Sequence, residues 1–233
     1  MKRKIHLLFF LSLIAFISCH STGSKNTEPL PPSAKFNLRD WKLQIPGPKD
    51  ITDLESYSSK YFCLNENKEM VFQLDASEKG TTKNTVFVRS ELRHLKNWQI
   101  NENHKMSATL QVVSNLDPDK ITVLKIHGFT SAGEYAPTLL RIAKNNNRLI
   151  AFLNVSSKPK DIRSYVLVEG LEENFFYCEI IIKNSILTVK INDVEKLRRD
   201  VSYWMYSSYF KAGCYPQSHN GTVKVIFRKL EVE

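Results

Sequence analysis

The chain has 233 residues and a mass of 26.9 kDa, of which 42% of residues are hydrophobic and 11% aromatic. This length and composition support one sizeable core and exclude an intrinsically disordered protein. The formal net charge of +9 at pH 7 favours an anionic partner, such as a nucleic acid, an acidic glycan or a lipid headgroup.

The first 19 residues have the layout of an export signal. Three basic residues are followed by an apolar run from Ile5 to Ile17 that is short for a membrane-spanning helix, and then by Ser18 and Cys19. A small residue before a cysteine is similar to the lipobox of bacterial lipoproteins, in which the cysteine is acylated after cleavage. We expect an exported protein, anchored to the cell envelope by a lipid on Cys19. The alternative is ordinary cleavage with no role for Cys19.

Residues 20–34 are rich in Ser, Thr, Pro and Lys and lack apolar periodicity, which predicts a flexible tether. The folded domain is therefore expected over residues 35–233. Without the three basic residues of the signal, the net charge falls to +6, still in favour of an anionic partner. The domain has three cysteines, Cys63, Cys178 and Cys214, whose spacing fits no zinc pattern; one disulfide with a free thiol and three buried thiols both remain open.

From residue 35 onward, short runs rich in Val, Ile, Phe, Tyr and Thr alternate with turn residues, which predicts a mostly β protein. A helix is also expected over residues 51–59, with Asp50 as its cap, and the asparagine-rich turns 145–147 and 183–185 predict hairpins. This many strands without repeats favours a two-sheet sandwich or jelly roll. The expected strands are 41–45, 70–74, 86–95, 104–113, 121–129, 138–144, 149–154, 175–183, 186–191, 209–217 and 222–232.

Three of these strands have a polar face. Alternation places Arg89, Glu91 and Arg93 on one side of the strand 86–95. It places Lys125 and His127 on one side of the strand 121–129. In the segment YFKAGCYPQ, the residues that share a side are Tyr209, Lys211, Gly213, Tyr215 and Gln217. Each face alone is typical of a solvated antiparallel sheet. Together they predict one concave sheet face lined by cations and by groups that titrate or donate hydrogen bonds.

This set favours a carboxylated polymer as ligand, because Arg and Lys bind carboxylates and the tyrosines offer flat surfaces and phenolic protons. His127 and Tyr215 form a candidate base and acid pair. Glu91 has no second carboxylate nearby in these strands, which argues against the paired-carboxylate mechanism of glycoside hydrolases and points to elimination.

Several segments of the chain resemble those of a known family, the polysaccharide lyase family 7 alginate lyases. The segments RSELR at 89–93, KIH at 125–127 and YFKAGCYPQ at 209–217 resemble the signatures R(S/T)ELR, Q(I/V)H and YFKAGxYNQ. The segment FNLRDWKLQIP at 36–46 resembles the family's first strand, so the likeness covers about residues 35–232. It implies a β-jelly roll with a substrate groove and cleavage of 1,4-linked uronates by β-elimination.

The resemblance also implies roles. Arg89, Lys125, His127 and Tyr215 would be catalytic: Arg89 and His127 engage the substrate carboxylate, His127 or Tyr215 takes the C5 proton, and Tyr215 protonates the leaving oxygen. No metal or organic cofactor is required. The expected substrate-binding residues are Glu91, Arg93, Tyr209, Lys211 and Gln217.

Two positions depart from the family pattern. Lys125 stands where the family has Gln, and Pro216 where it has Asn. A lysine still neutralises a carboxylate, and its charge is expected to lower the pKa of a nearby Tyr215, but it cannot copy the donor and acceptor pair of an amide.

The leading hypothesis is thus a monomeric, lipid-anchored lyase acting on alginate, with an anionic polysaccharide as its partner. Lys125 motivates the alternative of another polyuronate, such as glucuronan. A non-catalytic glycan-binding module is the alternative from a different class, although it would not need both His127 and Tyr215. Nucleic-acid binding is not expected, because the basic residues of this exported domain are not clustered in the sequence.

Overall fold

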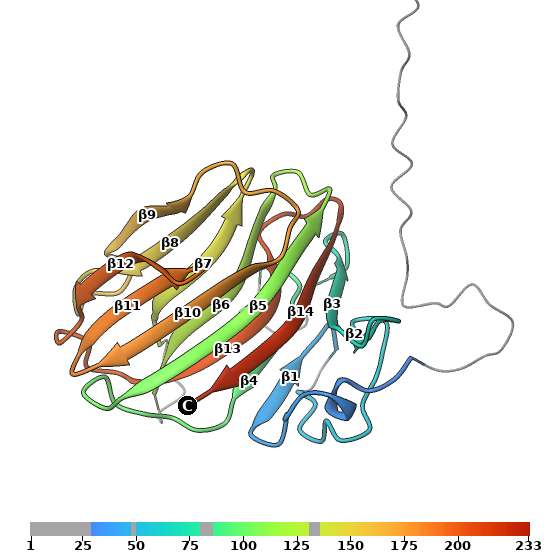
Figure 1. Cartoon of the computed structure of the whole chain (residues 1–233), viewed down its shortest axis with the longest axis horizontal. Coiled ribbons are helices and arrows are strands. Elements are labelled where there is room, and N and C mark those ends of the chain that lie inside the picture. Colours follow the sequence, from blue (N-terminus) through green and yellow to red (C-terminus); the bar gives the residue numbers. More distant parts are fainter. Residues whose placement is uncertain (1–28, 48–49, 80–85, 131–135) are drawn as a thin grey trace, which may run out of the picture.

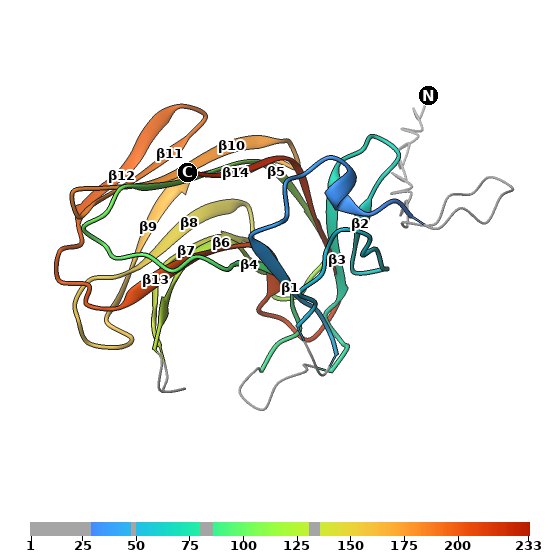
Figure 2. The same ribbon diagram turned by 90° about the horizontal axis from the view of Figure 1, so that it is seen from below.

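A computed structural model describes residues 29–47, 50–79, 86–130 and 136–233, and these form two antiparallel sheets that pack face to face. In Figure 1, β5, β10 and β14 lie in front of β6, β7 and β8, and Figure 2 shows the two sheets as stacked layers. The all-β, jelly-roll sandwich expected from the sequence is confirmed.

The first sheet has seven strands, in the order β1 (Trp41–Gln44), β4 (Ser90–His94), β13 (Ser207–Pro216), β6 (Lys120–Phe129), β7 (Thr138–Asn145), β8 (Arg148–Asn154) and β9 (Ile162–Val168). The second also has seven, in the order β12 (Val194–Asp200), β11 (Ile186–Ile191), β10 (Phe176–Lys183), β5 (His104–Ser114), β14 (Thr222–Val232), β3 (Met70–Asp75) and β2 (Phe62–Leu64). A short 3-10 helix, η1 (Pro32–Ala34), precedes them. The signature segments therefore lie on adjacent strands of one sheet, although they are distant in sequence.

The core fills the space between the sheets. In β13, Phe210, Ala212 and Cys214 are fully buried, as the alternation predicted for the side opposite the polar residues. In the second sheet, the Phe72 ring packs against Phe62 and Phe227 at centroid distances of 5.1 Å and 5.3 Å. Burial of such rings supplies about 1.5–3 kcal/mol each, which makes the sheets a rigid support for the polar face.

Most predicted strands are confirmed, with ends that differ by a residue or two. The long run expected over 86–95 forms a strand only over Ser90–His94, so Arg89 directly precedes β4. The strands β2, β9 and β12 were not predicted. Both hairpins are confirmed, because Asn146, Asn184 and Ser185 have the positive φ angles, 53°, 51° and 59°, that tight turns between strands need.

The helix expected over residues 51–59 is wrong. Ile51 instead exchanges two backbone hydrogen bonds of 2.8 Å with Leu43 of β1, and Ser59 forms a bridge with Phe62. Pairing with a neighbouring strand thus satisfies the backbone groups that a helix would have satisfied internally.

Cys178 and Cys214 are buried free thiols, whereas Cys63 is disulfide-bonded, so the alternative of three buried thiols is wrong and these three cysteines do not pair with one another. Burial raises the pKa of both thiols, which suppresses their reactivity. The predicted signal and the predicted lipidation site at Cys19 lie outside the described residues. Within the described ranges, no helix is long and apolar enough to cross a membrane.

Candidate active site

The register of the first sheet places five cations in one row. Lys211 of β13 lies between Arg93 of β4 and Lys125 of β6, and the row continues to Lys42 of β1 and Arg141 of β7. Like charges directly opposite one another on adjacent strands repel. The row therefore requires anionic partners, either in the protein or in a ligand.

Glu91 supplies the buried part of that compensation. Its carboxylate, 1% exposed, accepts from Lys125 Nζ at 2.7 Å, pairs with Lys211 Nζ, and lies 3.9 Å from Arg89 Nη1. One carboxylate thus faces three cations, and these cations hold the pKa of Glu91 far below its usual range despite its burial. Glu91 was predicted to bind substrate; in the structure it is buried and pairs with Lys125 and Lys211, and its binding of substrate stays a prediction.

The same network extends to the edge of the sheet. Lys211 Nζ donates to Gln44 Oε1 at 2.7 Å, and Gln44 Nε2 donates to Asp50 Oδ1 at 3.2 Å. Asp50 also pairs with Lys42, with 2.7 Å between its Oδ2 and the Lys42 Nζ. These contacts fix Lys211, only 2% exposed, as part of the floor of the site.

Tyr215 lies over the cations. Its ring centroid is 4.8 Å from the Arg89 guanidinium carbon and 4.2 Å from Lys125 Nζ. Lys125 was expected to lower the pKa of Tyr215; instead, burial raises this pKa, and Arg89 is the main group that opposes the rise. The phenol therefore keeps its proton at neutral pH, which suits a general acid.

His127 is held in a neutral form. Its Nδ1 lies 2.8 Å from the Gly128 carbonyl oxygen, which requires the Nδ1–H tautomer and leaves the lone pair on Nε2. Burial lowers the pKa of His127 to about 4. The His127 ring stacks on the Tyr209 ring at a centroid distance of 5.4 Å. The Tyr209 ring also contacts Arg93, whose guanidinium carbon lies 4.1 Å from the ring centroid.

Burial also lowers the pKa of Lys125 to about 7, although Glu91 opposes the change. The site thus holds a protonated phenol, Tyr215, a neutral imidazole, His127, and an amine, Lys125, that gains or loses its proton close to neutral pH. A base, an acid and cationic donors on adjoining strands can remove a proton beside a carboxylate and protonate a leaving group.

Comparison with known proteins identifies the family. Residues 36–233 match the family described as alginate lyase. The chain belongs to polysaccharide lyase family 7. Among curated proteins, none matches the chain significantly in sequence.

Solved alginate lyases share this fold. Family 7 alginate lyase A1-II' in complex with a product, GGG, is 25% identical, with a TM-score of 0.80 over 87% of this chain and 98% of that one. Alginate lyase A1-II' solved at 1.0 Å is 26% identical, with a TM-score of 0.77 over 87% of this chain and 97% of that one. An alginate lyase from Pseudomonas aeruginosa, 24% identical, has a TM-score of 0.75 over 84% of this chain and 98% of that one.

The family's third segment depends on Gly213 in this chain. A Cβ atom there would lie 2.5 Å from the Ser90 carbonyl oxygen and 2.8 Å from Glu91 Cα, and the φ angle is +145°. Only glycine allows β13 to approach β4 this closely. The register shift of β13 between Ala212 and Tyr215 then places the Tyr215 ring over Arg89 and Lys125.

The remaining predicted residues lie around this centre. Gln217 Nε2 donates to Thr122 Oγ1 at 2.8 Å, which ties the end of β13 to β6. Arg93 donates through Nη1 to the His94 carbonyl at 2.8 Å and through Nη2 to Asn97 Oδ1 at 2.8 Å, which sets its guanidinium over Tyr209. Pro216 pairs with Ile121 at the end of β13, and nothing in the structure explains why it replaces the family's Asn.

Sequence reasoning missed Gln44, Asp50 and Arg141. Arg141 lies beside Lys125 in register, 4.9 Å from the Phe152 ring centroid, and its charge acts to lower the pKa of Tyr215. Among the described residues, no group of three or more His, Cys, Asp and Glu side chains is placed to hold a metal ion.

Proposed function

We propose that this chain is a polysaccharide lyase that cleaves 1,4-linked uronate polymers, alginate first among them, by β-elimination. Membership of the alginate lyase family over residues 36–233 supports the activity. The observation that supports the chemistry most strongly is that adjacent strands carry neutral His127, protonated Tyr215 and a buried cation cluster.

The difficult step is removal of the C5 proton. This proton lies beside a carboxylate, so its loss places a second negative charge next to the first. Arg89 and Lys125 offer positive charge to the substrate carboxylate, and one such contact typically contributes about 3–4 kcal/mol of transition-state stabilisation. Because His127 is neutral and its Nε2 has a lone pair, it is placed to accept the proton, whereas its Nδ1–H is already donated to the Gly128 carbonyl and is not available to the carboxylate.

The elimination then completes without a cofactor. The C5–H electron pair forms the C4–C5 double bond, the C4–O4 bond breaks, and the Tyr215 phenol protonates O4. The products are one chain with a new reducing end and one with an unsaturated uronate at its non-reducing end. If His127 takes the C5 proton, it must release that proton to water, and water must return a proton to Tyr215, before the next cycle.

The test is incubation of the purified domain with polymannuronate, polyguluronate and glucuronan, while the ultraviolet absorbance of the unsaturated product is followed. We expect absorbance to rise on at least one alginate block. No rise on any uronate would refute the lyase, and binding without a rise would favour the non-catalytic module.

Tyr215→Phe tests the acid. We expect turnover to fall at least about a hundredfold, as loss of a general acid typically causes, while binding of the polymer is retained. Tyr177→Phe, the same change on β10 of the other sheet, is the matched control and should leave turnover intact. Full turnover by Tyr215→Phe would remove Tyr215 from this role.

Lys125 favours glucuronan as the second candidate substrate, because it replaces the amide of the family's Q(I/V)H segment. Lys125→Gln restores the family residue and should change the ranking of the three polymers. An unchanged ranking would show that Lys125 does not select the substrate.

We also propose that the protein is exported as a monomer and anchored to the cell envelope through Cys19. The apolar segment 5–17, followed by Ser18 and Cys19, supports this. Metabolic labelling with a radioactive fatty acid should mark the wild-type protein but not Cys19→Ser. Equal labelling of both, or of neither, would refute the anchor.

A further inference from the structure

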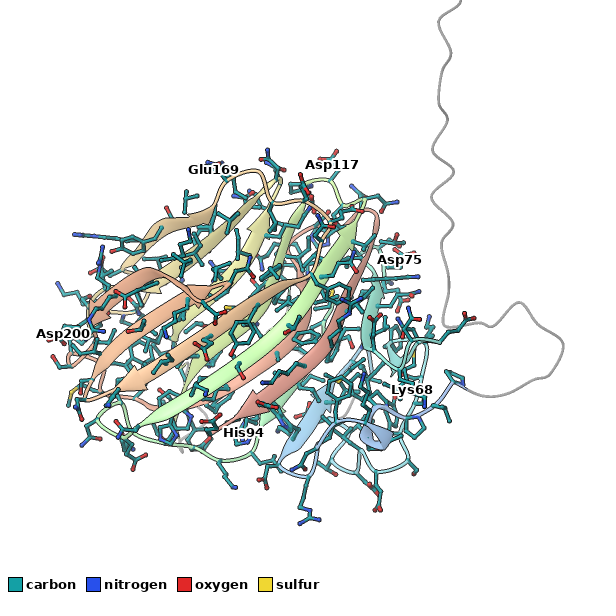
Figure 3. All side chains as sticks on the ribbon, viewed as in Figure 1. Lys68, Asp75, His94, Asp117, Glu169 and Asp200 are labelled. Atoms are coloured by element: carbon teal, nitrogen blue, oxygen red, sulfur yellow. The ribbon has the colours of Figure 1, made fainter. Side chains whose placement is uncertain are left out.

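A hollow of about 520 Å³ lies where β9 and β12 adjoin, at one side of the sandwich. Both are edge strands: β9 is the last strand in the order of the first sheet, and β12 is the first in the order of the second. Figure 1 shows them on the side opposite β1 and β4, and in Figure 3 Glu169, just after β9, and Asp200, at the end of β12, mark this side. Both strands are largely exposed, which is unusual for a sheet whose other strands are mostly buried.

This hollow is separate from the candidate active site. In the first sheet, β7 and β8 lie between β6, which contributes Lys125 and His127, and β9. Three strand spacings of about 4.8 Å place β9 roughly 14 Å from β6. A ligand in the hollow would therefore not touch the reacting groups, yet a long polymer could reach both places.

The lining is basic. Three cations of β12, Lys196, Arg198 and Arg199, line the hollow together with one acid, Glu195, while Arg163 of β9 and Asp200 at the end of β12 are exposed beside it. The Arg198 and Glu195 side chains are 3.9 Å apart and are 61% and 48% exposed, so this pair is weak and does not neutralise the site. The excess of cations favours an anionic ligand.

The lining also holds an aromatic ring beside a guanidinium. The Arg199 guanidinium carbon of β12 lies 4.8 Å from the Tyr165 ring centroid of β9, and this contact joins the two strands. Arg199 Nη1 donates to the Arg198 carbonyl at 2.7 Å, which orients the guanidinium. Guanidinium groups bind carboxylates through two parallel hydrogen bonds, and a tyrosine ring offers a flat apolar face with a polar tip. A uronate, with a carboxylate on a sugar ring, needs both kinds of contact.

From this arrangement we propose that the β9/β12 hollow is a second, non-catalytic binding site for a stretch of the uronate polymer. The inference rests on the proposed function for the identity of the polymer. It adds that the chain is held at two places, so that the hollow raises the local concentration of cleavable bonds at the active site. The competing explanation is that the charges only protect two exposed sheet edges from pairing with other chains.

The test compares wild type with Arg198→Ala/Arg199→Ala on polymer and on a uronate trisaccharide, which is too short to reach both places. We expect the KM for the polymer to rise roughly three- to tenfold, as loss of two exposed charge contacts allows. The value of kcat/KM for the trisaccharide should be unchanged. Lys183→Ala/Lys229→Ala, which removes two exposed cations from the second sheet, is the control and should resemble wild type.

Equal polymer KM values for wild type and the arginine variant would overturn the proposal, as would an equal rise in the control. Thermal melts of both variants exclude misfolding as the cause. Electrophoresis through a gel containing alginate gives a second readout that needs no cleavage: the arginine variant should lose retardation that wild type and control keep. If no polymer is cleaved but this retardation pattern holds, the proposed function fails and the second site stands.

Discussion

Replacing Glu91 by glutamine perturbs the buried charge cluster with little change in shape. The carboxylate lies 2.7 Å from Lys125 Nζ and also pairs with Lys211, and these lysines are only 4% and 2% exposed. Removing one partner of a buried ion pair typically costs about 3–5 kcal/mol, because the other charge is left without compensation. Two lysines lose a partner here, while Lys211 keeps its hydrogen bond to Gln44. We expect the free energy of unfolding to fall by about 4 kcal/mol at pH 7.

Urea denaturation of wild type and Glu91→Gln gives this difference. The matched control is Glu179→Gln, because Glu179 also lies between two lysines, at 4.0 Å and 3.6 Å, but those lysines are about one-third exposed. Its loss should cost under about 1 kcal/mol. Costs that are equal for the two variants would refute the reasoning.

The pH dependence provides an independent check. Burial lowers the pKa of Lys125 and of Lys211, and without Glu91 both values fall further. Folded wild type releases the Lys125 proton near pH 7, whereas folded Glu91→Gln releases it at a lower pH, so between these two pH values the variant gains stability relative to wild type as pH rises. The deficit should therefore shrink as pH rises from 5.5 to 7.5; a constant deficit would show that Lys125 is not the cause.

Three further predictions concern the same sheet. The pKa of His127 is lowered to about 4, so kcat/KM should decline as pH falls below about 5. Because the folded state resists protonation of His127, wild type should lose about 3 kcal/mol of stability relative to His127→Gln between pH 6.5 and pH 4. A stability difference that does not change with pH would contradict this. Gly213→Ala should cost at least about 2 kcal/mol in urea denaturation, more than Gly170→Ala, whose Cβ would meet nothing within 4 Å; equal costs would argue against the close approach. Arg141→Ala should raise the KM for alginate several-fold with kcat little changed, and an unchanged KM would place Arg141 outside the substrate path.

The strands that sequence predicts well are those with one buried side. In β13 the period of two is clear because Phe210, Ala212 and Cys214 are buried on one side of the strand. The strand β12, VEKLRRD, has a single buried residue, Leu197, so no alternation reveals it. The strand β2 is only three residues long, too short for any pattern. Edge and short strands form because a neighbour offers backbone partners, and this information is not local.

The site was predictable as a set of residues but not as a network. Alternation assigns Glu91 and Lys125 to polar faces, and the family segments give them roles. Alternation does not reveal which strands are neighbours in the sheet. Glu91 contacts both Lys125 and Lys211 because β13 pairs with β4 on one side and with β6 on the other. For the same reason Arg141, whose strand carries no family segment, could not be assigned to the site from its sequence. Asp50, predicted to cap a helix, instead contacts Lys42 and Gln44.

Glu91 explains how the cluster tolerates a cation, Lys125, where the family has an amide. An additional buried charge beside Lys211 and Arg89 would be costly by itself, but Glu91 already lies between the strands and accepts from Lys125 at 2.7 Å. An ammonium has three N–H donors, so Lys125 can keep this contact and still offer a donor to a substrate carboxylate. Unlike an amide, it changes charge near neutral pH, because its pKa is about 7. A bound polyuronate would raise that pKa and hold the proton in place, so the substrate itself strengthens the positive charge that its elimination requires.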